Sequence, residues 1–417
     1  MSSLKLTSVN KIYPSGVPAL TDINLEVDDN EFIVVVGQEK SGKSTLIRLI
    51  SGLDDTSSGT VEINGKDVTG LEPKARDVAV VFKGDTLFPG DTIFDNLAFG
   101  LKVRKAPQTL IEERVRVVAE ILGITDLLYK KPKNLVSSEK LKVAFGRALV
   151  REPQLFMFDE PLSGLDSKLR ADMLNIIINL QIRTKAPYIY ATRNLQDALA
   201  IGTRLVILRE GFIQQADTPA NLYDYPANTY VAFYIGQPTI NLIFNANLVS
   251  AEDGGVAVKC DFGSIPVSGK IKARIENLEE YLDKDRKVIL GIRPEDTQIV
   301  EEGGFFTATA VQNSYAGNAI YTECTAGRSN LNVKFREVGE NWSGDWDEGA
   351  PFKDHDFQVT TDTEHLYLFD GETRLTILAK DEGYEKTSHK DADRMPKSFI
   401  EEREILKQLA PQKKKKK

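Results

Sequence analysis

The sequence predicts an α/β domain with a mainly parallel sheet, followed by a smaller all-β domain. Over residues 1–235, buried apolar strands alternate with helical stretches, which is typical of a parallel sheet covered by helices. Beyond residue 235, short strand-like runs dominate, separated by glycine and charged turns, as in a small barrel. The end of the chain is strongly polar and finishes in five lysines. We therefore expect domains at 1–235 and 236–381 and a polar tail at 382–417.

Each element of the first domain has its own local signal. Residues 1–30 alternate apolar and polar positions, which predicts antiparallel strands. The run EFIVVVG (31–37) predicts a buried strand, and the following SGKSTLIRLISGL opens as a helix. Asn64-Gly65 is a hairpin turn signal, and residues 109–128 have the apolar spacing of a helix. Three more strands are predicted at 153–161, 187–193 and 203–211, with a helix at 194–202 between the last two.

Composition narrows the possible classes of protein. The chain has 417 residues, of which 41% are hydrophobic and 27% charged, and this profile excludes a mostly disordered or fibrous protein. It contains no apolar run near the ~20 residues of a membrane span and no signal-peptide pattern, so we expect a cytoplasmic protein. The net charge of −8 argues against nucleic-acid binding, and two cysteines without paired spacing predict neither disulfides nor a zinc site.

A glycine-rich loop predicts a phosphate site. Residues 37–44 read GQEKSGKS and match G-x-x-x-x-G-K-[ST] at every position, between a predicted strand and a predicted helix. The backbone N–H groups of such a loop cradle phosphate oxygens, and the helix N-terminus adds a favourable potential. Lys43 would reach the β and γ phosphates, Ser44 would ligate Mg²⁺ and Thr45 would support the phosphates. The predicted binding residues here are Gly37, Ser41, Gly42, Lys43, Ser44 and Thr45.

Two carboxylates supply the second half of this site. Asp159 and Glu160 end the apolar run LFMFDE. Asp159 is positioned to hold Mg²⁺ through water, and Glu160 to orient or deprotonate an attacking water as the general base. Together with the loop, in which Lys43 also acts as a catalytic group, these residues predict a nucleotide site with Mg²⁺.

The motifs together resemble a known family over about residues 4–380. The chain is similar to the ATP-binding subunits of ABC importers, in the sugar and glycerol-phosphate group typified by the maltose importer ATPase. The stretches that carry the resemblance are GLDDTSSGTVEINGKDVT, LFPGDTIFDNLAFGL, GRALVREPQLFMFDEPLSGLDSKLR, TPANLYDYPANTYVAFYIG, VILGIRPED and HLYLFD.

The resemblance carries several implications for this chain. It implies a P-loop ATPase domain with a helical subdomain, followed by an oligonucleotide-fold-like regulatory domain. It further implies ATP and Mg²⁺ as ligands and permease transmembrane subunits as partners. The protein would then lie in the cytoplasm, on the inner face of the cell membrane. Tyr13 falls where the family stacks an aromatic ring on adenine.

The chain departs from the family at the signature motif. In this family two nucleotide domains sandwich each ATP between one phosphate loop and the other chain's L-S-G-G-Q. Here the equivalent residues, starting at Leu135, read LVSSE. Val136 replaces the serine that would bond the γ-phosphate, Ser137 and Ser138 replace both glycines, and Glu139 presents a carboxylate to a polyanion.

Two further departures lie on the phosphate-loop side. The family glutamine that senses Mg²⁺ and the attacking water falls at Lys83, which can neither accept a hydrogen bond from water nor ligate a cation. The family's switch histidine falls at Arg193, which can still bind a phosphate oxygen. We therefore count Lys83 and Arg193 among the residues that face the nucleotide.

These departures predict a degenerate subunit that holds ATP and hydrolyses it weakly. A homodimer would carry two poor sites, so we expect pairing with a second, non-identical ATP-binding subunit that has intact motifs. The alternative is a non-transport regulatory or scaffold protein that binds ATP without turnover. A soluble ATPase of translation or repair is a third reading, which the importer-type second domain disfavours. No nucleic acid is expected as a partner.

Overall fold

The structure is a computed structural model that describes residues 2–84, 87–251, 254–282, 286–315, 319–337, 353–384, 394 and 396–409. The chain divides into two compact units, the first built on the residues up to Pro219 and the second beginning at Ala220. Residues 220–235 thus group with the second unit, because Thr229 N–H donates to the carbonyl of Arg374 (3.1 Å). The predicted functional boundary after residue 235 stays a prediction. The run of five lysines lies outside the described residues.

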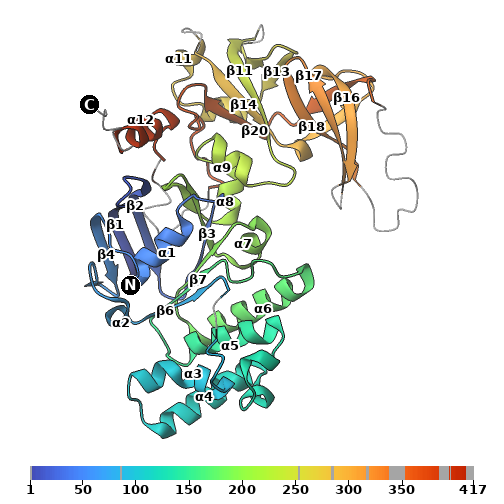
Figure 1. Ribbon diagram of the computed structural model, residues 1–417. Coiled ribbons are helices and arrows are strands. Elements are labelled where there is room, and N and C mark those ends of the chain that lie inside the picture. Colours follow the sequence, from blue (N-terminus) through green and yellow to red (C-terminus); the bar gives the residue numbers. More distant parts are fainter. Residues whose placement is uncertain are drawn as a thin grey trace, which may run out of the picture. The chain divides into compact units, whose positions relative to one another are not determined.

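A six-stranded sheet forms the centre of the first unit (Figure 1). Its order is β10-β9-β3-β8-β7-β6, in which β9 and β10 pair antiparallel and the other neighbours pair parallel. β3, β7 and β8 are buried at every residue, as strands covered on both faces must be. The strands are β3 (Phe32–Val36), β6 (Val78–Phe82), β7 (Leu155–Asp159), β8 (Tyr188–Thr192), β9 (Arg204–Arg209) and β10 (Phe212–Asp217).

The carboxyl ends of three parallel strands meet at one edge of this sheet. Val36 of β3 pairs with Thr192 of β8, and Asp159 of β7 pairs with Ala191 of β8. The loops that follow these strands therefore begin side by side, and they carry the predicted phosphate site.

A four-stranded antiparallel sheet of order β2-β1-β4-β5 completes the strands of the first unit. Asn64 and Gly65 both have positive φ (49° and 73°) in the turn from β4 to β5, as the predicted hairpin turn requires. The strands are β1 (Ser2–Ile12), β2 (Pro18–Asp28), β4 (Ser58–Ile63) and β5 (Lys66–Asp67).

Helices flank the central sheet and form a separate layer beyond its β6 edge. α3, α4 and α5 pack on one another, and α5 contacts β6; Figure 1 shows these three helices gathered together. The predicted helical spacing at 109–128 corresponds to α4, which buries Ile111, Val115, Val118 and Leu122 on one face. The helices are α1 (Lys43–Ser51), α2 (Pro73–Arg76), α3 (Ile93–Val103), α4 (Gln108–Leu122), α5 (Ser137–Leu149), α6 (Ser167–Thr184) and α7 (Leu195–Ile201).

The second unit is built on two five-stranded antiparallel sheets. Their orders are β13-β12-β11-β14-β20 and β15-β19-β16-β17-β18, and their inward side chains share one apolar core. The prediction of a strand-rich second domain is confirmed. The strands are β11 (Asn241–Ser250), β12 (Val256–Lys259), β13 (Ser264–Val267), β14 (Val288–Ile292), β15 (Thr297–Val300), β16 (Phe306–Tyr315), β17 (Ala319–Ala326), β18 (Ser329–Glu337), β19 (Asp356–Thr361) and β20 (Leu366–Asp370).

Several short helices were not predicted after residue 217. α10 begins where the Ser268 side chain accepts a hydrogen bond from Ile271 N–H (3.3 Å), a cap that a search for strands overlooks. Among the described residues, no helix has both the length and the apolar character that crossing a membrane requires. The additional helices are α8 (Pro219–Asp224), α9 (Thr229–Tyr234), α10 (Gly269–Arg274), α11 (Leu278–Leu282) and α12 (Phe399–Leu409).

Candidate functional site

The loop between β3 and α1 can form only with glycine at two positions. A Cβ on Gly37 would lie 2.2 Å from the carbonyl oxygen of Leu208. Gly42 has φ +108°, and a Cβ there would lie 2.7 Å from the carbonyl oxygen of Ala19. Gly42 is also the N-cap of α1 and offers no side chain to the helix, so the first N–H groups of α1 remain available to an anion.

Lys43 is buried beneath this loop. Its Nζ donates to the carbonyl oxygens of Gly37 (2.9 Å) and Gln38 (2.8 Å). Burial lowers the pKa of the Lys43 ammonium, and the nearby carboxylate of Glu160 opposes this shift. Lys43 thus supplies positive charge to the loop while its hydrogen bonds are to neutral oxygens, those of two carbonyls and the Ser41 hydroxyl, an arrangement that suits a phosphate group.

Ser44 and Asp159 provide two oxygen atoms at the start of α1 and the end of β7. Ser44 Oγ donates to Asp159 Oδ1 at 3.0 Å. Burial raises the pKa of the Asp159 carboxyl, and the hydrogen bond from Ser44 opposes this shift. A hydroxyl and a carboxylate are hard donors that fit Mg²⁺, which usually takes one or two protein ligands and completes its shell with water and phosphate. Within the described ranges, no group of three or more His, Cys, Asp or Glu side chains could hold a metal ion.

Arg193 follows β8 and joins two carboxylates at the same sheet edge. Its Nε lies 3.1 Å from Glu160 Oε1, and its Nη1 lies 3.6 Å from Glu39 Oε2. Glu160 is 18% exposed and follows β7, whereas Glu39 is 77% exposed and belongs to the 37–44 loop. The guanidinium therefore links three loops. Glu39 was not among the predicted site residues, although it stands within the recognised loop motif.

Tyr13 and Lys83 are the other two predicted residues near the loop. The Tyr13 hydroxyl lies 3.2 Å from Thr45 Oγ1 and donates to Asp54 at 3.3 Å, so the ring is held beside α1. Lys83 directly follows Phe82, the β6 residue that pairs with Asp159, so its backbone lies at the same sheet edge.

The residues at the predicted signature position lie apart from this cluster in the helical layer. Val136 precedes α5 and exposes its side chain, and Ser137, Ser138 and Glu139 form the first turn of the helix. Glu139 Oε2 accepts a hydrogen bond from Val136 N–H at 3.0 Å. In the described part of the chain, no hydrogen bond or ion pair joins these four residues to the 37–45 segment.

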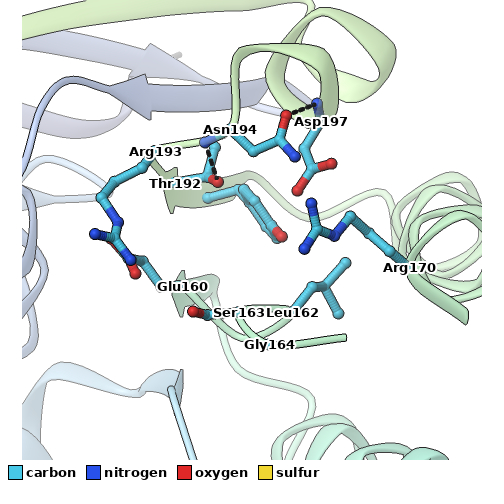
Figure 2. Close-up of a pocket in the computed structure, with 10 residues that line it drawn as sticks. Glu160, Leu162, Ser163, Gly164, Arg170, Thr192, Arg193, Asn194 and Asp197 are labelled. Atoms are coloured by element: carbon cyan, nitrogen blue, oxygen red, sulfur yellow. Dashed lines mark hydrogen bonds and ion pairs between the residues drawn. The ribbon is translucent and has the colours of Figure 1, made fainter. Parts of the chain in front are cut away.

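A cavity of about 120 Å³ lies behind Arg193, and sequence analysis gave no signal for it. Figure 2 shows Glu160 and Arg193 together on one side of this cavity and Asp197 facing Arg170 on the other. The hydroxyl of Tyr190 and the Nε of Arg170 are buried there without a hydrogen-bond partner. Burial raises the pKa of the Asp197 carboxyl, an effect that Arg170 opposes. These residues come from three elements, so only the fold reveals their proximity.

Comparisons with known proteins point to one family. A family model described as ABC transporter matches residues 20–163. The oligosaccharides import ATP-binding protein MsmX of Bacillus subtilis is 42% identical over 296 residues, which cover 71% of this chain and 79% of that protein. The sn-glycerol-3-phosphate import ATP-binding protein UgpC of Psychromonas ingrahamii is 35% identical over 379 residues, covering 90% and 96%.

A solved structure agrees as well. The structure of cbiO1 from Clostridium perfringens, part of an ABC transporter complex, matches with a TM-score of 0.50 and 25% identity, covering 53% of this chain and 90% of that one. The fold, the loop and these relatives lead to one conclusion: the chain belongs to the ATP-binding subunits of ABC transporters.

Proposed function

We propose that this subunit serves an importer of a carbohydrate or related solute, holds ATP with Mg²⁺, and hydrolyses it weakly. The observation that carries the proposal is a contrast within one site. The groups for binding phosphate and Mg²⁺ are assembled, while the carboxylate that would activate water is paired with an arginine. Relatives named for importing oligosaccharides and sn-glycerol-3-phosphate support this class of solute.

The binding half of the proposal rests on the loop and the two strands beside it. Backbone N–H groups at the start of α1 and the Lys43 ammonium would neutralise the phosphates. Ser44 and Asp159 would hold Mg²⁺, which in turn would neutralise charge on the terminal phosphates. Tyr13, held beside Thr45, would offer its ring to the adenine.

Weak hydrolysis follows from the surroundings of Glu160. A general base must accept a proton from water within hydrogen-bond reach. Arg193 Nε lies 3.1 Å from Glu160 Oε1 and competes with water for that carboxylate. Lys83, placed where the family has a glutamine, has no acceptor with which to orient the water.

The start of α5 supports pairing with a different subunit. In the family, this helix start would face the phosphates bound to the other subunit. Here Glu139 already caps it by accepting the Val136 N–H (3.0 Å), so the helix terminus carries its own anion. In a homodimer, the start of α5 in one copy would therefore bind poorly to the ATP held by the other copy. A different subunit with an intact signature would bind that ATP better.

A groove in the first unit supports docking to a membrane subunit. It encloses about 620 Å³ between β6, α3 and α5. The apolar side chains of Phe99 and Val103 are exposed along it, while Arg104, Arg147 and Arg151 supply positive charge. Exposed apolar side chains ringed by charge are typical of a protein-binding surface. A short amphipathic helix of a permease subunit would fit, and the protein would then lie on the cytoplasmic face of the membrane.

The first experiment measures binding of Mg·ATP and steady-state hydrolysis by the purified full chain. Lys43→Ala is the control, because it removes the buried ammonium. We expect tight binding in the native chain, loss of binding in Lys43→Ala, and negligible hydrolysis by either. Brisk hydrolysis that Lys43→Ala abolishes would refute the claim that Arg193 disables Glu160.

A second experiment separates transport from a scaffold role. The chain would be purified under mild conditions from membranes of its source, and co-purifying proteins would be identified by mass spectrometry. A permease and a second ATP-binding subunit support the proposal. Soluble partners without a permease would favour the regulatory or scaffold alternative, which the altered signature motif also suits.

A further inference from the structure

We propose that Glu39 lowers the preference of the site for a nucleoside triphosphate over a diphosphate, because its carboxylate competes with the terminal phosphate for Arg193. The inference rests on the proposed ATP binding and extends it to a residue that the loop motif leaves variable. It concerns relative affinity, and hydrolysis plays no part in it.

The first observation is where Glu39 lies. It belongs to the loop that would cradle the phosphates, yet it carries the same sign of charge as they do. Its Oε2 lies 3.6 Å from Arg193 Nη1, while the Nε of the same guanidinium lies 3.1 Å from Glu160 Oε1. The Nε of Arg193 is thus paired with the better-buried Glu160, and its Nη1 faces Glu39 in the 37–44 loop.

The second observation is the difference in exposure between the two carboxylates. Glu39 is 77% exposed and Glu160 18%. An exposed ion pair at this distance is weak and screened by solvent, so an incoming anion can displace Glu39 readily. The Glu160 pair is shorter and better shielded, so Arg193 would stay in place when Glu39 leaves.

The third observation connects Arg193 to the position of a bound phosphate. The charges of Glu160, Arg193, Asp159 and Glu39 all affect the pKa of Lys43, which shows that these groups lie within electrostatic reach of its ammonium. A phosphate held by Lys43 therefore also feels Arg193 and Glu39. In a triphosphate, the additional terminal group can replace the Glu39 carboxylate on Arg193, whereas a diphosphate lacks that group.

These observations give a specific expectation for Glu39→Gln, which keeps the length of the side chain and removes its charge. Freeing Arg193 from its competitor should tighten triphosphate binding by about twofold to fivefold, the range of an exposed ion pair. Plain repulsion between Glu39 and any phosphate would instead act on diphosphate as well. The effect on diphosphate should stay below about 1.5-fold, since a diphosphate lacks the terminal group that would replace Glu39 on Arg193, and the remaining repulsion is screened by salt.

The test is a double-mutant cycle by isothermal titration calorimetry on the full chain. The variants are Glu39→Gln, Arg193→Gln and the two combined. Each is titrated with Mg²⁺ and either ADP or the β,γ-imido analogue of ATP, which resists hydrolysis. Glu113→Gln, on the exposed face of α4, makes the same change in net charge far along the chain and serves as the matched control.

Support would be a selective gain: Glu39→Gln tightens triphosphate in the native background, leaves ADP nearly unchanged, and loses its effect when Arg193 is also replaced. Equal gains for both nucleotides, or the same gain with and without Arg193, would overturn the inference and leave ATP binding intact. A gain of equal size in Glu113→Gln would also overturn it, as an effect of net charge. Failure of every variant and of the native chain to bind either nucleotide would refute the proposed function itself.

Discussion

Lengthening Asp197 by one methylene should stabilise the first unit, because its carboxylate stops short of Arg170. Asp197 is buried, and no hydrogen bond or ion pair joins its carboxylate to any other described residue. Arg170 Nε is also buried without a partner, and both side chains line the cavity of about 120 Å³ (Figure 2). In the Asp197→Glu variant the longer side chain would bring the carboxylate closer to the guanidinium of Arg170.

The expected gain can be worked out from three contributions. A buried methylene contributes about 0.8 kcal/mol. A hydrogen bond between charged groups contributes roughly 1.5 kcal/mol at the low end of its range. The extra rotamer freedom lost on folding costs about 0.5 kcal/mol. The net expectation is about 1–2 kcal/mol in the free energy of unfolding, since the added group fills only part of the cavity.

The assay is urea unfolding followed by circular dichroism, in which the transition of the first unit is identified by its shift with Mg·ATP. Asp197→Asn is the control, because it removes the buried charge without closing the gap. Native stability should fall as pH rises through the raised pKa of Asp197, since the protonated form is favoured in the folded state. The Asp197→Glu variant should lose that fall. Destabilisation by Asp197→Glu alongside a neutral Asp197→Asn would refute the reasoning.

Four further predictions test other parts of the site. Tyr13→Ala should weaken ATP binding by about tenfold without changing affinity for inorganic triphosphate, because only the adenine contact is lost; calorimetry with both ligands checks this. Glu139→Ala should cost about 1 kcal/mol of stability through loss of the α5 cap, and Glu139→Gln should restore part of it in urea titrations. Phe99→Asp should abolish co-purification with a permease while nucleotide affinity stays unchanged. Asp159→Asn should stabilise the nucleotide-free chain by about 1 kcal/mol near neutral pH, a gain that disappears on acidification as the native carboxyl takes up its proton, and it should weaken Mg²⁺-dependent binding.

Two carboxylates of this chain occupy positions to which the proposed function would bring phosphate. Glu39 lies in the 37–44 loop beside Arg193, and Glu139 caps α5, where the signature motif is predicted. In each case a carboxylate of the chain itself lies where a phosphate would otherwise be attracted: Glu39 beside the Arg193 guanidinium, and Glu139 beside the N–H groups at the start of α5. The proposed need for a different partner subunit follows from Glu139, and the proposed competition for Arg193 follows from Glu39. The proposed weak hydrolysis rests instead on the pairing of Arg193 with Glu160.

The order of strands and helices could be predicted because it depends on local pattern. Short apolar runs such as 32–36 and 155–158 are typical of strands buried on both faces, and the glycines at 37 and 42 mark the loop between strand and helix. The short helix that Ser268 caps was not predicted, because a single hydrogen bond to Ile271 starts it within a strand-rich region.

The sequence identified Arg193 as a site residue, but the ion-pair partners of Arg193 could not be predicted from it. Glu39, Glu160 and Arg193 stand far apart in the chain, and they meet because β3, β7 and β8 end at one edge of the sheet. The cavity that Asp197 and Arg170 line likewise exists only once α6 and α7 pack beside β8. Local patterning determines which segments become strands, helices and phosphate loop. The pairing of charges across loops depends on long-range register, and only the folded chain decides it.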